Sequence, residues 1–221
     1  MRIWTLISTA ILGLIVSVDC SALSVGTHRE LNSYVLQNDP YIDNTLKNYN
    51  LPEGVRTQYK AIDPSTNTVK DLPILDIIAN GGITEDGQSF TDYRYINHFH
   101  SPLKPWDQSA LPKSLLIDIF CNDPISNPLW ALAGPDVNSY SWPAARQYLY
   151  NALTATDNDT RNTNFVNCFR SVGQLMHIMQ DMSVPAHVRD NSHADGNIYE
   201  IWVDNELNDL QSGPFDAPKV S

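Results

Sequence analysis

Five potential metal ligands fall within 24 residues in the last quarter of the chain. They are three histidines and two acids: His177, Asp181, His187, His193 and Glu200. Imidazole nitrogens and carboxylate oxygens are ligands that Zn²⁺ takes readily, and the same groups serve as general acids and bases. The chemistry that these residue types indicate is metal binding by histidine and carboxylate.

The spacing of His177 and Asp181 would place both side chains on one face of a helix, because they are four residues apart. An isolated pair of this kind is more often a buried histidine that is hydrogen-bonded to its acid. The density of ligands favours a metal site, since an even distribution would place fewer than one of the six histidines in this window.

Two earlier segments carry residues of the same types. Glu85 and Asp86 lie in a turn between glycines, and His98 follows twelve residues after Asp86. His28 comes much earlier, at the start of a predicted helix. We prefer Asp86 to Glu85 as the functional acid, because the adjoining Gly87 gives its backbone freedom to turn inward. Each segment taken alone is an ordinary feature of a loop or a helix start.

The elements that must position these residues are predicted to be helices. Thr27 and Glu30 have the spacing of a capping box, which predicts a helix as far as about Gln37. Apolar spacing predicts further helices over 39–49, 69–79, 142–155, 158–182 and 197–211. No other segment alternates convincingly with period two. Residues 80–141 are rich in Gly, Pro, Asn, Asp and Ser and are expected to form long loops over a helical core.

The helix predicted over 158–182 has the clearest pattern. Its apolar residues recur at spacings of three and four: Phe165, Phe169, Val172, Met176 and Met179. Leu175, Ile178 and Met182 widen this stripe, and Pro185 ends the helix. The predicted fold is therefore an all-α, compact multi-helix domain with long loops.

Composition limits the classes of protein to which the chain can belong. Its 221 residues are 42% hydrophobic, which is enough for one globular core, and we assign 23–211 to a single domain and 212–221 to a tail or linker. The net charge of -11 argues against a module that binds duplex DNA. Three cysteines without a CxxC pair exclude a zinc ribbon, and a disulfide between Cys121 and Cys168 is left open.

Residues 1–22 are predicted to be an export signal. After a short positive end, residues 3–18 carry no charge, and this stretch is too short for a comfortable membrane span. Small residues favour cleavage after Ala22, which would make Leu23 the first residue of a periplasmic or secreted protein without a transmembrane segment. A lipid anchor at Cys20 is the alternative, and the preceding Asp19 fits it poorly.

Together these features resemble the zinc-dependent phospholipases C and the related nucleases of the nuclease P-one type. The resemblance extends from Leu23 to about Asp204. Its most specific part is the ordered series Gly173, His177, Gln180, Asp181, Pro185, His187, followed by Tyr199, Glu200 and Trp202. This family implies a small exported all-α enzyme that holds three zinc ions in a cleft.

The resemblance implies ligands for two neighbouring zinc ions. The first would be bound by Asp86, His98, His177 and Asp181. The second would share Asp181 and add His28 with the free amino nitrogen and carbonyl oxygen of Leu23. Cleavage of the signal would create the amino ligand, because the nitrogen of Leu23 is an amide in the uncleaved chain.

The implied third zinc site departs from the family pattern. His187 and Glu200 match the pattern, but the histidine expected four residues before the glutamate is replaced by Gly196. His193 is predicted to take its place. His100 is the one histidine that the three sites do not use.

The resemblance implies an exported zinc-dependent hydrolase that cleaves phosphodiester bonds through a zinc-bound hydroxide. Asp86 is the candidate catalytic acid, either as a ligand or as the acceptor of the proton of the water. The substrate would be a phospholipid head group or a single-stranded nucleic acid, with the phospholipid slightly preferred. The alternative is a non-catalytic exported domain in which zinc is structural and the long loops bind a partner. The sequence leaves the oligomeric state open.

Overall fold

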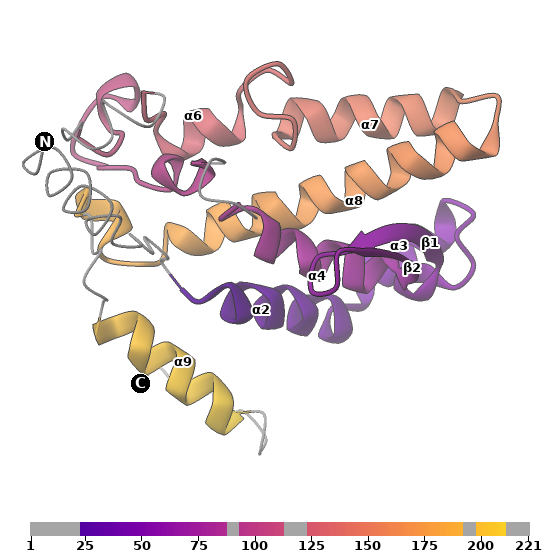
Figure 1. The fold of residues 1–221 in the computed structure, drawn as a ribbon, viewed down its shortest axis with the longest axis horizontal. Helices are drawn as coiled ribbons and strands as arrows, with labels where there is room; N and C mark the ends of the chain where they lie inside the picture. The colour runs from indigo at the N-terminus through magenta and orange to yellow at the C-terminus, as the bar shows by residue number, and fades with distance from the viewer. Residues whose placement is uncertain (1–22, 88–92, 113–122, 192–197, 211–221) are drawn as a thin grey trace, which may run out of the picture.

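The computed structural model describes residues 23–87, 93–112, 123–191 and 198–210, and this part of the chain is mostly helical (Figure 1). The prediction of an all-α class is confirmed in its helical content, with a single small sheet in addition. The export signal, the tail at 212–221, His193 and Cys121 lie outside the described residues.

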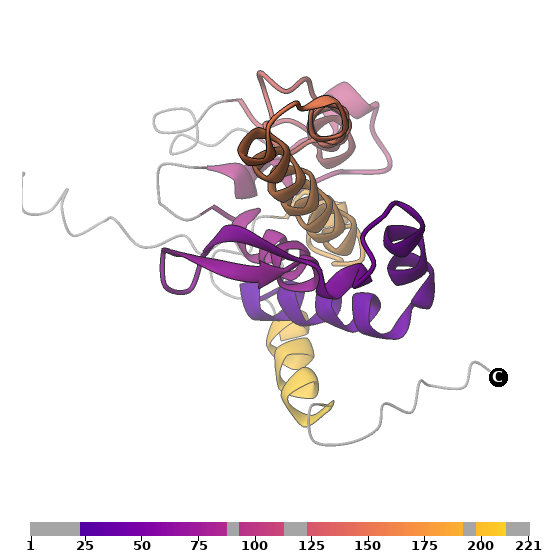
Figure 2. The ribbon, with the colours of Figure 1, turned by 90° about the vertical axis from the view of Figure 1, so that its right-hand side faces the viewer.

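Four helices form the centre of the molecule. The longest, α8 (Asn158–Asp181), packs between α7 (Trp142–Thr154) and α4 (Ile74–Thr84), and α2 (Val25–Asn38) packs against α4 (Figure 1). Figure 2 shows α7 and α8 on one side of the molecule and α2 on the other. The remaining elements are α3 (Pro40–Asn48), α6 (Asn127–Ala131), α9 (Ile198–Leu210) and four 3-10 turns, η1 (Gly54–Arg56), η2 (Arg94–Asn97), η3 (Trp106–Gln108) and η4 (His187–Arg189).

The predicted helix over 69–79 is wrong in its first half. Strands β1 (Gln58–Asp63) and β2 (Thr68–Pro73) form an antiparallel hairpin, and α4 begins only at Ile74. Proline disfavours helical backbone in the residue before it, so Pro73 keeps the chain extended up to the start of α4. The turn is set by Asn67, whose φ of 51° is left-handed.

The start of α2 also differs from the prediction. Ser24 is the N-cap, and its side chain accepts a hydrogen bond from the backbone nitrogen of Thr27 at 3.2 Å. The hydroxyl of Thr27 instead donates to the carboxylate of Asp204 in α9. The helix therefore begins at Val25, and Thr27 connects its first turn to the last helix.

Helix α8 changes character along its length. Asp157 caps its start by accepting a hydrogen bond from Thr160 at 2.7 Å, and 24 residues give it a length of about 36 Å. Its first half contributes Phe169 to the main core, which otherwise consists of Leu36, Val55, Tyr59, Ala61, Ile74, Ile77 and Ile78. The buried face of its second half is polar. The prediction that Met179 is buried is wrong, because it lies about 200° around the helix from His177 and is 74% exposed.

Two glycines bring α4 and α8 into close contact. A β-carbon on Gly173 would lie 1.9 Å from the carbonyl oxygen of Ile78, and one on Gly81 would lie 2.6 Å from the carbonyl oxygen of Arg170. Only glycine permits this separation. The contact places the last turn of α4, with its backbone carbonyls, against the polar half of α8.

The segment predicted as long loops is only partly regular. The described part of 80–141 contains the last turn of α4, the five-residue α6 and the turns η2 and η3.

No helix among the described residues is long and apolar enough to cross a membrane.

Candidate metal centre

The polar half of α8 ends in a cluster of buried imidazoles and carboxylates. His28 comes from the first turn of α2, Asp86 from the residues after α4, and His98 from the end of η2. His177 and Asp181 come from α8 itself. All but Asp86 are fully buried, and the side chain of Asp86 is 10% exposed. Burying these groups without compensation costs free energy, so their arrangement requires an explanation.

Asp181 lies at the centre of the cluster. Its Oδ2 is 2.9 Å from Nδ1 of His98 and 3.3 Å from Nε2 of His177. Its Oδ1 is 3.5 Å from Nε2 of His28. The two oxygens of one carboxylate therefore face different histidines.

Asp86 faces two of the same imidazoles. Its Oδ1 lies 3.4 Å from Nδ1 of His98 and 3.6 Å from Nε2 of His177. Two overlapping groups result, in each of which the ligand atoms lie within 4.8 Å of one another: His28 with His177 and Asp181, and Asp86 with His98 and His177. The side-chain ligands implied for the first and second zinc ions are thus brought together.

The inward-facing atoms make no hydrogen bond of normal geometry with any described residue. They are Nε2 of His28, Nδ1 of His98, Nε2 of His177, and both carboxylate oxygens of Asp86 and Asp181. Buried polar atoms almost always have partners, so these seven atoms, which face one another, fit the binding of a metal ion. Nitrogen and oxygen ligands without sulfur suit zinc.

The outward-facing nitrogens of two of these histidines are hydrogen-bonded. Nδ1 of His177 donates to the carbonyl oxygen of Gly82 at 2.6 Å, and Nδ1 of His28 donates to Oε1 of Gln180 at 2.7 Å. Gln180 is held in turn by Asn32, whose Oδ1 accepts from Nε2 of Gln180 at 2.8 Å. These bonds fix the tautomer that leaves Nε2 deprotonated and directed inward, as in metal-binding histidines.

The charges of the cluster are strongly coupled. Burial alone would raise the pKa of Asp181, but His177 and His98 hold it well below its usual range. Asp181 also outweighs the effect of burial on His98 and raises the pKa of this imidazole to about 10. Burial and the neighbouring His177 lower the pKa of His28 to about 3. In the metal-free protein, protonated His98 therefore carries the positive charge that a bound metal ion would otherwise supply at the centre of the cluster.

Glu85 and Asp86 have different surroundings. Burial raises the pKa of Asp86, whose oxygens face the imidazoles without hydrogen bonds. Both oxygens of Glu85 accept hydrogen bonds, Oε1 from Trp130 at 2.8 Å and Oε2 from Arg94 at 2.6 Å. This geometry agrees with the choice of Asp86 as the ligand, because the oxygens of Glu85 are engaged elsewhere.

Among the described residues, those implied for the third zinc do not form a group of three ligands. His187 is fully buried, donates from Nδ1 to the carbonyl oxygen of His98 at 3.1 Å, and stacks on Phe99 with ring centroids 4.3 Å apart. Glu200 is 8% exposed in the first turn of α9. Neither belongs to the two ligand groups, and the position predicted for His193 lies beyond what the structure describes.

Two predictions remain, that Leu23 is a ligand and that His100 is not. Leu23 is buried in a small apolar cluster with Val184 and Ala186, just before η4. His100 is 9% exposed, packs edge-on against Trp106 with ring centroids 6.0 Å apart, and is outside both ligand groups.

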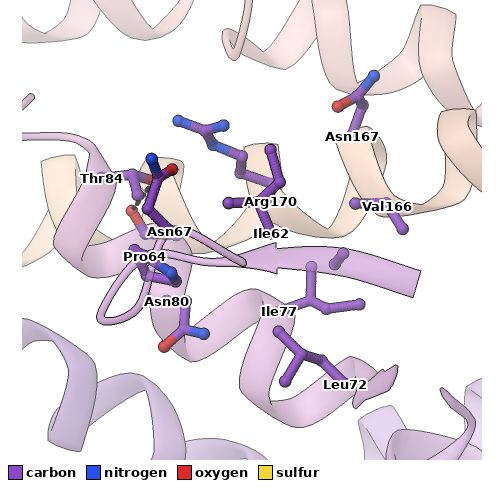
Figure 3. Close-up of a pocket in the computed structure, with 12 residues that line it drawn as sticks. Ile62, Pro64, Asn67, Leu72, Ile77, Asn80, Thr84, Val166, Asn167 and Arg170 are labelled. Atoms are coloured by element: carbon purple, nitrogen blue, oxygen red, sulfur yellow. Dashed lines mark hydrogen bonds between the residues drawn. The ribbon is translucent and has the colours of Figure 1, made fainter. Parts of the chain in front are cut away.

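A pocket of about 160 Å³ lies apart from this cluster, between the hairpin and helices α4 and α8 (Figure 3). Its lining includes Ile62, Leu72, Ile77 and Arg170, and none of the candidate metal ligands. We therefore place the candidate site at the histidine cluster.

The signals for the supporting residues are weak in the sequence. Gln180 directly precedes Asp181, but its role depends on His28, 152 residues earlier. The carbonyl of Gly82 has no side-chain signal at all.

Comparison of the chain with models of protein families, with curated proteins and with solved structures finds no match.

Proposed function

We propose that the chain is an exported zinc-dependent phosphodiesterase. The observation that carries the proposal is the pair of three-residue ligand groups that share His177, with their inward-facing atoms buried and without hydrogen bonds. Two adjoining metal sites that share ligands are typical of hydrolases that act on phosphate esters, in which both ions act on the attacking and leaving oxygens. Two overlapping groups therefore support a hydrolase over the alternative of a structural zinc site.

The five side chains of the two groups would hold the metal. Asp181 would serve both groups, because its two oxygens face different histidines. Bound zinc would supply an activated water and positive charge against a phosphodiester. The outer hydrogen bonds of His28 and His177 hold these imidazoles in place before metal arrives, so that little reorganisation accompanies binding.

Asp86 is the residue proposed to move a proton. Its Oδ1 is the oxygen near His98 and His177, which leaves Oδ2 as the atom that can take up a proton. Burial favours the protonated carboxyl, because it raises the pKa of Asp86.

The charge of the chain bears on the substrate. A net charge of -11 repels phosphodiesters everywhere except where positive charge is concentrated, and up to three zinc ions would concentrate it at the cluster. We propose that a phospholipid head group or a single-stranded nucleic acid is bound there. The third zinc, held by His187, His193 and Glu200, belongs to the same proposal.

The proposal is tested by hydrolysis assays on the zinc-loaded chain that begins at Leu23. Phosphatidylcholine vesicles and a single-stranded oligonucleotide serve as paired substrates, and the chelated protein is the control. Turnover of one substrate that is lost on chelation and restored by Zn²⁺ would support the proposal. Zinc binding without turnover of either substrate would leave the structural alternative.

A further inference from the structure

A buried carboxylate lies directly behind one of the candidate ligands. Glu85 is fully buried, and its Oε1 is 3.7 Å from Nε2 of His98. The other ring nitrogen, Nδ1, is 2.9 Å from Asp181. The imidazole of His98 therefore lies between two carboxylates, one in the cluster and one outside it.

Glu85 is held in place by two donors. Arg94 donates to its Oε2 at 2.6 Å, and the indole nitrogen of Trp130 donates to its Oε1 at 2.8 Å. A buried carboxylate persists only where such partners compensate its desolvation. Rotation of Glu85 into the cluster would leave Arg94 buried without its countercharge.

Arg94 is itself fixed from several sides. The nitrogen that binds Glu85 also donates to the side-chain oxygens of Asn138 and Gln174, both at 3.0 Å. Its guanidinium lies over the ring of Trp130, 4.9 Å from the centroid. Arg94 thus connects Glu85 to α8 through Gln174, which lies three residues before His177 on that helix. The position of Glu85 is determined by the core and does not depend on the metal.

We propose that Glu85 is a positioning residue that orients His98, with Arg94 and Trp130 holding it. The inference rests on the proposed function. On loading with zinc, Nε2–H of His98 donates to Oε1 of Glu85, and Nδ1 is left deprotonated toward Asp86 and Asp181. Nε2 of His98 and Oε1 of Glu85 are now 3.7 Å apart. We expect this distance to shorten to that of a hydrogen bond when zinc binds, because such contacts commonly tighten on binding.

The ion pair with Arg94 limits the charge that Glu85 adds to the site. Arg94 neutralises Glu85, so the glutamate gives His98 a hydrogen-bond acceptor while adding little net charge to the site. His28 and His177 achieve the same with neutral oxygens, those of Gln180 and Gly82. Every histidine of the two groups thus has an outer acceptor that selects its tautomer.

Histidine side-chain NMR on the zinc-loaded protein tests the arrangement directly. Long-range ¹H–¹⁵N spectra distinguish a protonated ring nitrogen from one that binds zinc. For His98 we expect a proton on Nε2 and zinc on Nδ1, the reverse of His177. A proton on Nδ1 of His98 would overturn the inference.

Three variants separate positioning from stability, with Zn²⁺ affinity measured by competition with a chromophoric chelator. Glu85→Ala should bind zinc 10- to 100-fold more weakly, the range usual for outer partners of ligands. Glu85→Gln should recover part of the loss, because its amide oxygen can still accept from His98. Ser171→Ala is the control: it also removes a buried hydrogen bond, the one that the Ser171 hydroxyl donates to the carbonyl oxygen of Asn167 at 2.8 Å, and it should change the affinity less than threefold.

The outcomes distinguish this inference from the proposed function. An equal loss of affinity in Glu85→Ala and Ser171→Ala would show general disruption and overturn the positioning role. Zinc binding with the expected tautomers but without phosphodiester turnover would leave the positioning role standing and remove the proposed function. A chain that binds no zinc would overturn both.

Discussion

At the scale of single residues, the site depends on atoms that are buried and face one another. Asp181 has the most contacts of this kind, because its oxygens lie within 3.5 Å of His28, His98 and His177. A histidine contributes one inward nitrogen, whereas this carboxylate contributes two oxygens. The consequences of substitution should therefore be largest at Asp181.

Replacing Asp181 with asparagine should lower phosphodiester turnover by more than about 100-fold, beyond the loss usual for an outer partner of a ligand. The change removes one negative charge and one of the two ligand oxygens. Turnover and zinc content per chain are the measurements. His100→Ala is the control, because His100 lies outside both ligand groups, and it should retain most of both. A fully active Asp181→Asn protein would show that the wrong residues are assigned.

The affinity for zinc should rise with pH. The pKa of His98 in the metal-free protein is raised to about 10, so near neutral pH this imidazole carries a proton that zinc must displace. Release of this proton makes the affinity about tenfold stronger per pH unit, and His177 steepens the dependence, because Asp181 and Asp86 outweigh its burial and raise its pKa as well. His28 contributes nothing to it, because its pKa is lowered to about 3 and the ring is already neutral. Chelator competition at pH 6, 7 and 8 measures the slope, and a flat profile would contradict the prediction.

At the scale of elements, the close contact of α4 and α8 assembles the site. It brings the carbonyl oxygen of Gly82 to His177, and the residues after α4 carry Asp86 toward the same imidazole. This geometry requires a glycine at the point of contact, since a β-carbon at Gly173 would lie 1.9 Å from a backbone oxygen.

Gly173→Ala should therefore destabilise the fold by about 1–3 kcal/mol, the cost of overpacking a close contact, and weaken zinc binding as α4 moves away. Gly26→Ala in α2 is the matched control, because a β-carbon there meets only the Ser24 hydroxyl at 3.5 Å. The control should be neutral or slightly stabilising, since alanine has the higher helix propensity. Urea denaturation gives both free energies of unfolding, and equal values would refute the role of the contact.

The sequence predicted elements best where the signal was local. His177 and Asp181 are one helical turn apart, and the end of α8 before Pro185 is also set by neighbours in the chain. The hairpin was missed because its alternation is short, although burial of Tyr59 and Ala61 follows period two.

The supporting network was not predictable for a different reason. Arg94 joins Glu85, nine residues away, to Gln174, 80 residues away. Arginine and glutamine are ordinary surface residues by type, and only their burial reveals a structural role. Which of two adjacent acids faces the histidines likewise depends on tertiary contacts that no local pattern encodes.

At the scale of the whole molecule, the five ligands come from four separated segments, so bound metal would connect parts of the chain that are far apart in sequence. An ion that binds only the folded state stabilises it in proportion to the logarithm of its concentration over Kd. At 1,000 times Kd the gain is about 4 kcal/mol for one site. Exhaustive chelation should thus lower the thermal midpoint by several degrees, and scanning calorimetry with and without Zn²⁺ measures the shift. An unchanged midpoint would mean that the cluster is not an occupied metal site.

The last prediction concerns the amino terminus that cleavage of the predicted export signal would create. Cleavage after Ala22 would give Leu23 a free amine five residues before His28, and this amine and its carbonyl oxygen are proposed to bind the zinc that Asp181 shares. Burial of Leu23 beside Val184 and Ala186 fixes the backbone at this point. A single extra residue converts the amine into an amide, which is not basic and cannot bind in the same way.

An extended chain should therefore contain about one zinc ion fewer and turn over substrate much more slowly, while its helical content is unchanged because the apolar core is untouched. Leu23→Met in the correctly processed chain is the control, because it keeps the amine and approximately the volume of the side chain. This control should retain its full zinc content, since the proposed ligands are backbone atoms. Elemental analysis gives the zinc content, and circular dichroism checks the fold. Equal zinc content and equal turnover in the extended and processed chains would eliminate the amino-terminal ligand, and the two groups around His177 would then have to bind metal without it.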